Sequence, residues 1–163
     1  MRAYVGVGSN LGDRWANLAL AARQLRAAPR VALLRASRVY DSAPVGPPQP
    51  RYLNAVLELE SELTAPGLHA LLQLTERAAR RKPGAPRWTA RTLDLDLLLF
   101  GGEVLRTPRL LVPHPHLVSR RFVLLPLSEL APKLGVPGTG KTVSQLLCEA
   151  PPLDLFPAGR YPL

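Results

Sequence analysis

Two aspartates, Asp94 and Asp96, stand two positions apart in an otherwise apolar segment at residues 91–100. In a β-strand both carboxylates would share one face, about 6.6 Å apart along the backbone. A strand this apolar belongs inside a sheet, where like charges are costly unless a cation offsets them. We therefore expect a divalent metal with phosphate oxygens; the alternative is an amphipathic strand whose acids face water or pair with arginine. The opposite face would carry Leu93, Leu95, Leu97 and Leu99, while Leu98 and Phe100 would continue the acidic face.

A basic loop is predicted just before this strand, at residues 81–90. Taken alone it would be a solvated loop, but beside two carboxylates its cations could grip phosphate oxygens that a metal also holds. A tryptophan in such a loop suggests that it covers a ligand. We expect this loop and the proline-rich loop at 42–51 to be mobile without ligands and to close over substrates. The residues concerned are Arg80, Arg81, Lys82, Arg87 and Arg91, around Trp88.

Two histidines, His114 and His116, lie in a proline-containing loop after Arg109. A His-x-His pair can bind zinc, but no third nitrogen or sulfur ligand is evident nearby. His114 and Arg109 could instead contact a terminal phosphate. We interpret His116 and His69 as surface groups.

Two glycine patterns are interpreted as structural and not as nucleotide sites. Residues 135–142 match the letters of a phosphate-binding loop, but no buried strand precedes them and too few residues follow. A Gly/Pro turn leading into a short helix is the prediction there. The pair Gly6 and Gly8 lacks the third glycine and the alternating strands and helices of a dinucleotide-binding unit.

The spacing of apolar residues predicts the elements that must position these groups. Strands are expected at residues 3–8, 31–40 and 52–63, ahead of the acidic strand. Asp13 is expected to cap a helix after the first strand, and Thr64 to cap a second one after the third strand. The order β-α-β-β-α-β predicts an α+β fold: a ferredoxin-like antiparallel sheet with helices packed on one face.

The rest of the chain predicts a small C-terminal extension. Beyond Gly101 we expect a hairpin, a Pro/His loop, a helix near 119–130 and a proline-rich tail at 151–163. The length favours a single domain spanning 1–163. One cysteine and no long apolar run favour a cytoplasmic protein with no membrane segment. A net charge of +9 favours an anionic partner, either nucleic acid or a phosphorylated small molecule.

Taken together, these segments resemble the 6-hydroxymethyl-7,8-dihydropterin pyrophosphokinase family of the folate pathway. The matching elements appear in the family's order and cover residues 1 to about 130, and the one at 91–96 is highly specific to the family. They lie at residues 7–12, 40–46, 52–55, 76, 87–96 and 112–122.

The resemblance implies that ATP donates its β,γ-pyrophosphoryl group to the hydroxymethyl oxygen of the pterin, releasing AMP. It implies two Mg²⁺ ions held by Asp94 and Asp96, with Arg81 and Arg91 as further catalytic residues. ATP-binding residues implied in this way are Gln73, Glu76, Arg81, Arg91, Leu97, Arg109, His114 and Arg120. Pterin-binding residues are Ser42, Ala43, Val45, Tyr52, Asn54, Trp88, Asp94 and Phe122.

The chain departs from the family pattern at Pro83, Leu111 and Pro115, which replace an arginine, a hydroxyl residue and an aromatic residue. These departures bear on ATP affinity and leave the chemistry intact. We expect a monomer that acts on small molecules and binds neither nucleic acid nor membrane. The competing interpretation is an RNA-binding domain, but its central strands would need exposed aromatic residues in place of the two acids.

Overall fold

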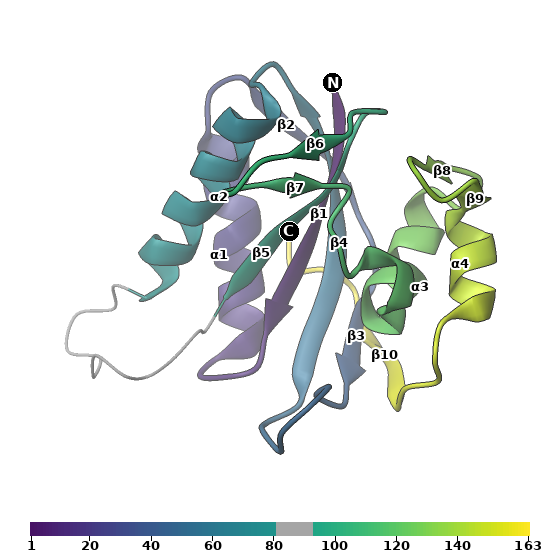
Figure 1. Cartoon of the computed structure of the whole chain (residues 1–163). Helices are drawn as coiled ribbons and strands as arrows, with labels where there is room; N and C mark the ends of the chain where they lie inside the picture. Colours follow the sequence, from purple (N-terminus) through teal and green to yellow (C-terminus); the bar gives the residue numbers. More distant parts are fainter. Residues whose placement is uncertain (81–92) are drawn as a thin grey trace.

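The computed structural model describes residues 1–80 and 93–163, and its centre is one antiparallel sheet (Figure 1). The strand order is β10-β3-β4-β1-β5, and β2 pairs with the far end of β4. The α+β, ferredoxin-like prediction is confirmed. The strands of this sheet are β1 (Arg2–Ser9), β2 (Val31–Ala36), β3 (Val39–Ser42), β4 (Tyr52–Ser61), β5 (Asp94–Phe100) and β10 (Leu155–Gly159).

Helices α1 (Arg14–Ala27) and α2 (Ala65–Arg80) cover one face of the sheet (Figure 1). Each begins at its predicted cap: the Asp13 carboxylate accepts a hydrogen bond from Ala16 N at 3.0 Å, and Thr64 Oγ1 accepts one from Gly67 N at 3.2 Å. Leu18, Leu25, Leu68 and Leu72 are fully buried against the sheet.

The helices of the C-terminal extension cover part of the opposite face, whereas Leu110 and Val112, earlier in the extension, pack in the first core with α1 and α2. These helices bury Leu124, Leu127, Val143 and Leu146 in a second core, which the sequence pattern did not assign to a face. Among the described residues, no helix combines the length and the apolarity that crossing a membrane requires. The extension consists of β6 (Leu105–Arg106), β7 (Leu111–Val112), a 3₁₀ turn (Leu117–Ser119), α3 (Arg121–Leu130), β8 (Gly135–Val136), β9 (Lys141–Thr142) and α4 (Val143–Glu149), before β10.

Residues 135–142, whose sequence matches the pattern of a phosphate-binding loop, form the β8–β9 hairpin. Thr142 ends the hairpin and caps α4, because its Oγ1 accepts from Gln145 N while Gln145 Oε1 accepts from Thr142 N. The prediction of a turn and a short helix is therefore confirmed.

The proline-rich tail is better ordered than its composition suggested. Residues 155–159 add strand β10 beside β3, and the buried Tyr161 hydroxyl donates to Leu18 O at 2.7 Å. The last residues of the chain are thus fastened to α1 and to the sheet.

The predicted single strand at 31–40 is two strands, β2 and β3, separated at Ser37 and Arg38. At the break Ser37 N still donates to Val56 O, but Val56 N donates to Ser37 Oγ and not to a main-chain oxygen, so the regular exchange of main-chain hydrogen bonds is interrupted there. Both strands still pair with β4, so the topology is unchanged.

The acidic strand β5 differs from the prediction in two ways. It pairs only with β1 among the described residues and so forms an edge of the sheet, not its interior. A β-bulge between Tyr4 and Val5 places Leu98 outside the pairing register, which reverses the alternation. Leu99 therefore joins the second core and Phe100 the first, the opposite of the expected faces.

Glu58 on β4 is a charged residue inside this framework, with only 1% of its side chain exposed. Its carboxylate accepts from Arg2 and from Arg35, both at 2.5 Å, and from the Tyr4 hydroxyl at 3.4 Å. Burial alone would raise the pKa of Glu58. The hydrogen bonds from Arg35 and Arg2 outweigh burial, so the pKa lies below its ordinary value of 4.5.

We expect Glu58→Gln to lower the free energy of unfolding at pH 7 by about 1–2 kcal/mol, since charge-assisted hydrogen bonds are lost. Because the folded pKa is depressed, the contribution of Glu58 is present above its unfolded pKa near 4.5 and is lost as the pH falls through the folded value. Urea melts between pH 3 and 7 should show a smaller loss on acidification for Glu58→Gln than for the wild type. Equal pH dependence of the two would contradict the assignment.

Candidate active site

The floor of the site is built from two glycines of β1. Gly8 pairs with Asn54 of β4 on one side and with Asp94 of β5 on the other, and Gly6 pairs in the same way with Val56 and Asp96. Adjacent strands are separated by about 4.8 Å, so Asn54 and Asp94 face each other across about 10 Å with no side chain between them. Two glycines with the same period as the acids thus create an open floor beside the carboxylates.

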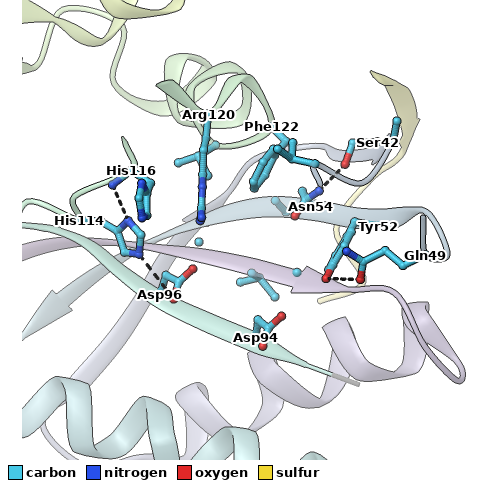
Figure 2. A pocket seen from close by; sticks show the side chains of 17 residues that line it. Ser42, Gln49, Tyr52, Asn54, Asp94, Asp96, His114, His116, Arg120 and Phe122 are labelled. Carbon is cyan, nitrogen blue, oxygen red and sulfur yellow. Dashed lines mark hydrogen bonds and ion pairs between the residues drawn. The ribbon is translucent and has the colours of Figure 1, made fainter. Parts of the chain in front are cut away.

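A cavity of about 430 Å³ stands on this floor (Figure 2). Its sides come from three parts of the chain: the acids of β5, the segment from β3 into β4, and the turn before α3. Val7, Ala55 and Val123 complete it. The other lining residues are Gly6, Gly8, Ser42, Ala43, Val45, Gln49, Tyr52, Asn54, Asp94, Asp96, His114, His116, Arg120 and Phe122.

The carboxylates of Asp94 and Asp96 lie on the same side of the cavity, as the two-residue period predicted (Figure 2). Both residues are half-buried, and the Asp96 side chain is 48% exposed. Burial is therefore a weaker reason for a metal than the sequence suggested. The mutual repulsion of the two charges remains.

The two carboxylates fit Mg²⁺ by their chemistry. The described residues contain no group of three or more protein ligands of the His, Cys, Asp or Glu type, so a protein-only metal cage is not formed there. Mg²⁺ in phosphate-transferring sites is bound by one or two carboxylates, and substrate phosphates and water supply its other ligands. The donor set at Asp94 and Asp96 matches that pattern.

His114 lies next to the acids, with its Nε2 3.9 Å from Asp96 Oδ1. Burial lowers the pKa of His114, Asp96 opposes this effect, and the positive charge of Arg120 adds to it. The ring is therefore neutral near pH 7. It can accept or donate a hydrogen bond beside the acids without a charge of its own.

Arg120 approaches the acids from the opposite side of the cavity, from the turn before α3 (Figure 2). Its guanidinium carbon lies 5.6 Å from the ring centroid of Phe122. This contact orients a cation toward a site that carries two negative charges. The arrangement suits an anion that also binds a metal at the carboxylates.

The end of the cavity away from the acids is suited to a flat polar ring. Tyr52 and Phe122 provide aromatic surface there, and Asn54 lies between them (Figure 2). Asn54 Nδ2 donates to Ser42 Oγ at 2.6 Å, which leaves Asn54 Oδ1 over the glycine floor. An aromatic ring with an N–H edge would find both stacking surface and an acceptor.

A second cavity, of about 240 Å³, lies on the other side of Asp96 and His114, which line both cavities. Its lining is mixed: it includes the apolar residues Leu97 and Leu111 and the exposed Arg109. His69 also lines it, so the prediction of a surface group is wrong for this residue. The Nδ1 atom of His69 is buried and has no hydrogen-bond partner among the described residues.

Glu76 and Gln73, both on α2, differ in their relation to the site. Glu76 Oε1 accepts a hydrogen bond from Leu95 N at 2.7 Å, so it holds the outer edge of β5 between the two acids. Burial raises the pKa of Glu76, and the charges of Asp94 and Asp96 add to this effect. Gln73 is exposed and lines neither cavity.

The structure brings together most of the site residues expected from the sequence. Arg81, Trp88 and Arg91 lie outside the described residues, as does the loop at 81–90. Sequence reasoning missed Gly6, Gly8 and Gln49, which line the main cavity. His116 is exposed, as expected of a surface group, and it also lines this cavity. The glycines could have been found from their period, which matches that of the two acids.

The fold and the site define a class of protein: an α+β enzyme that transfers a phosphate-containing group to a flat aromatic substrate. Comparison with known proteins is specific. The model of the family described as 7,8-dihydro-6-hydroxymethylpterin-pyrophosphokinase matches residues 4–132, and the chain belongs to this family.

Relatives agree along nearly the whole chain. The 2-amino-4-hydroxy-6-hydroxymethyldihydropteridine pyrophosphokinase of Pseudomonas aeruginosa is 42% identical over 151 residues, which cover 92% of each chain. The protein of the same name from Synechocystis is 40% identical over 89% of this chain and 74% of its own.

Solved structures show the same fold at low identity. A Plasmodium falciparum HPPK-DHPS triple mutant with SDX-DHP superposes with a TM-score of 0.72 at 12% identity, over 91% of this chain. This chain spans 44% of that longer protein.

Proposed function

We propose that this protein transfers the β,γ-pyrophosphoryl group of ATP to the hydroxymethyl group of 6-hydroxymethyl-7,8-dihydropterin, in folate biosynthesis. One observation carries the proposal: Asp96 lines both the aromatic, polar main cavity and the smaller second cavity, and Asp94 lines the main cavity beside it. Two substrates bound in these cavities would meet at Asp94 and Asp96. Membership of the pyrophosphokinase family supports the same assignment.

Asp94 and Asp96 would hold the Mg²⁺ ions, two by our proposal. When bound, the ions neutralise phosphate charge and favour an in-line displacement at the β-phosphorus. Arg120 would neutralise further phosphate charge from the opposite side. Neutral His114 would hydrogen-bond a phosphate oxygen close to Asp96 without repelling the metals.

The pterin would occupy the main cavity, between Tyr52 and Phe122, with its amide edge at Asn54. Backbone groups of Ser42, Ala43 and Val45 would complete its hydrogen bonds. Its hydroxymethyl oxygen would then point toward the acids and form the new bond to the β-phosphorus. The bond from that phosphorus to the α,β-bridging oxygen would break, AMP would leave with that oxygen, and the hydroxyl proton would pass to water. The residues of this cavity thus orient the attacking oxygen, which is the largest task of a protein in phosphoryl transfer.

The nucleoside end of ATP would occupy the second cavity. Leu97 and Leu111 offer apolar surface for a base, and Arg109 and His114 stand where the phosphates leave the cavity toward Asp96. Glu76 would act on ATP by holding β5 in place.

We propose Arg81 and Arg91 as residues that bind the phosphates of ATP, and Trp88 as a residue that covers the bound pterin. We also propose a cytoplasmic, single-domain monomer.

The test is an assay of AMP release by the purified protein with Mg²⁺, ATP and the reduced hydroxymethylpterin. We expect one AMP and one pterin diphosphate per turnover, no AMP without the pterin, and no turnover after chelation with EDTA until Mg²⁺ is restored. Release of ADP in place of AMP, or no product at all, would overturn the proposal.

A further inference from the structure

The connection between β3 and β4, residues 43–51, carries part of the main cavity. Ala43, Val45 and Gln49 line the cavity from this loop, and Ser42 and Tyr52 line it from the adjoining strand ends. Four of the nine loop residues are prolines, at positions 44, 47, 48 and 50. Proline fixes the backbone angle φ at these four positions, so the placement of the loop over the cavity, and the range of its expected motion, depend on how its two ends are held.

One residue of the C-terminal tail, Asp154, contacts both ends of this loop. Its main-chain oxygen accepts a hydrogen bond from Ala43 N at 2.8 Å, at the first loop residue. Its carboxylate accepts one from Arg51 Nη1 at 2.8 Å, at the last. Strand β10 follows immediately and pairs with β3, so Asp154 is itself anchored to the sheet.

Arg51 connects this contact to the rest of the framework. Its Nε donates to Asp41 Oδ1 at 2.5 Å and its Nη2 to Asp41 O at 3.3 Å. The guanidinium also lies 5.2 Å from the ring centroid of Phe156 on β10, and Arg14 Nη1 donates to Arg51 O at 3.2 Å. The side chain is thus fixed by two carboxylates and a ring, and such a network holds its geometry better than an isolated surface ion pair.

We propose that Asp154 and Arg51 are positioning residues for the pterin: the C-terminal strand fastens both ends of the loop 43–51 and sets the place of its cavity-lining residues. The inference rests on the proposed function for the identity of the ligand. Neither residue lines the cavity, so both act through the loop. A loop whose ends are fastened loses less conformational freedom when the pterin binds. This should raise the affinity for the pterin and leave the affinity for ATP unchanged.

The first test compares Asp154→Ala with Glu149→Ala, which breaks the exposed Lys141–Glu149 ion pair at the other end of the extension. The Asp154 side chain is 71% exposed, so we expect Asp154→Ala to raise the KM for the pterin roughly twofold to fivefold, the range that loss of an exposed ion pair implies. The KM for ATP and the melting temperature should match those of Glu149→Ala. Equal changes in both KM values, or none, would overturn the proposal.

The second test uses Arg51→Lys, which keeps the positive charge but cannot hold Asp41 and Asp154 with a fork of nitrogens. It should raise the KM for the pterin by a similar factor. The KM of the double variant Arg51→Lys/Asp154→Ala should not exceed that of the single variant with the higher KM. Additive effects would mean that the two residues act independently, contrary to the proposal.

A third measurement separates this inference from the proposed function. Asp154→Ala keeps the main-chain bond to Ala43 N and removes only the contact with Arg51. Hydrogen exchange of the Gln49 and Arg51 amides, followed by NMR in the ligand-free protein, should therefore be faster in Asp154→Ala than in Glu149→Ala, whatever reaction the protein catalyses. Unchanged exchange would refute the fastening itself. Faster exchange in a protein that releases no AMP would leave the fastening intact and refute the proposed function.

Discussion

Asp94→Asn and Asp96→Asn should each lower turnover by at least roughly a thousandfold, because each removes a charged ligand of the proposed Mg²⁺ ions, whose stabilisation of developing charge amounts to several kcal/mol. The amide has nearly the same shape as the carboxylate, so the cavity keeps its form. Steady-state AMP release at saturating substrates measures the loss. The affinity for MgATP, measured by calorimetry, should fall as well.

Stability distinguishes this outcome from unfolding. Asp94 and Asp96 repel each other, so removing one charge should leave the melting temperature unchanged or slightly higher. Glu103→Gln is the matched control: Glu103 is an exposed carboxylate just past the end of β5 and lines neither cavity. It should retain full turnover. Near-normal activity of either aspartate variant would refute the metal assignment.

The βαββαβ order was predictable because its signals are local. A cap such as Asp13 or Thr64 acts within three residues, and the alternation of Tyr52–Ser61 needs no knowledge of other strands. The acid pair was predictable for the same reason, since a two-residue period fixes the relative direction of Asp94 and Asp96 in any strand.

The structural features that could not be predicted from the sequence depend on pairing with strands far away in the chain. The bulge that moves Leu99 and Phe100 to unexpected faces arises in pairing with β1, about 95 residues earlier, and local alternation carries no sign of it. The position of β5 at the sheet edge was hidden because helices of both cores cover its two faces, so it has the composition of an interior strand.

The same distinction explains the errors at the site. Gly6 and Gly8 were compared with a nucleotide-binding fingerprint because glycine spacing alone does not show which strands lie beside it. Once β4 and β5 are known to lie on either side of β1, it is clear that the lack of a side chain at Gly8 leaves open space between Asn54 and Asp94. His69 was taken for a surface group because Leu110 and Leu111, which line the second cavity together with it, come from a distant segment.

Asn54→Ala should raise the KM for the pterin by roughly 30- to 100-fold, the second large effect that we expect. Asn54 Oδ1 lies over the glycine floor, held there by the bond from Nδ2 to Ser42 Oγ at 2.6 Å. Removal of the acceptor should weaken binding of the pterin strongly, because the ligand's N–H groups are then buried without a hydrogen-bond partner. The KM for ATP should stay within about twofold, since Asn54 does not line the second cavity.

Gly8→Ala tests the same pairing without touching the amide. A Cβ at position 8 would stand 3.0 Å from Asn54 Oδ1, tighter than nine in ten real Cβ contacts, so the Asn54 amide must shift by a few tenths of an ångström. The variant should therefore lose pterin affinity while its acids stay in place. Ser42→Ala, which frees the amide to rotate but leaves it present, should show a smaller loss. If Asn54→Ala and Gly8→Ala both bind the pterin as the wild type does, the aromatic ring lies elsewhere in the cavity and the acceptor role of Asn54 is wrong.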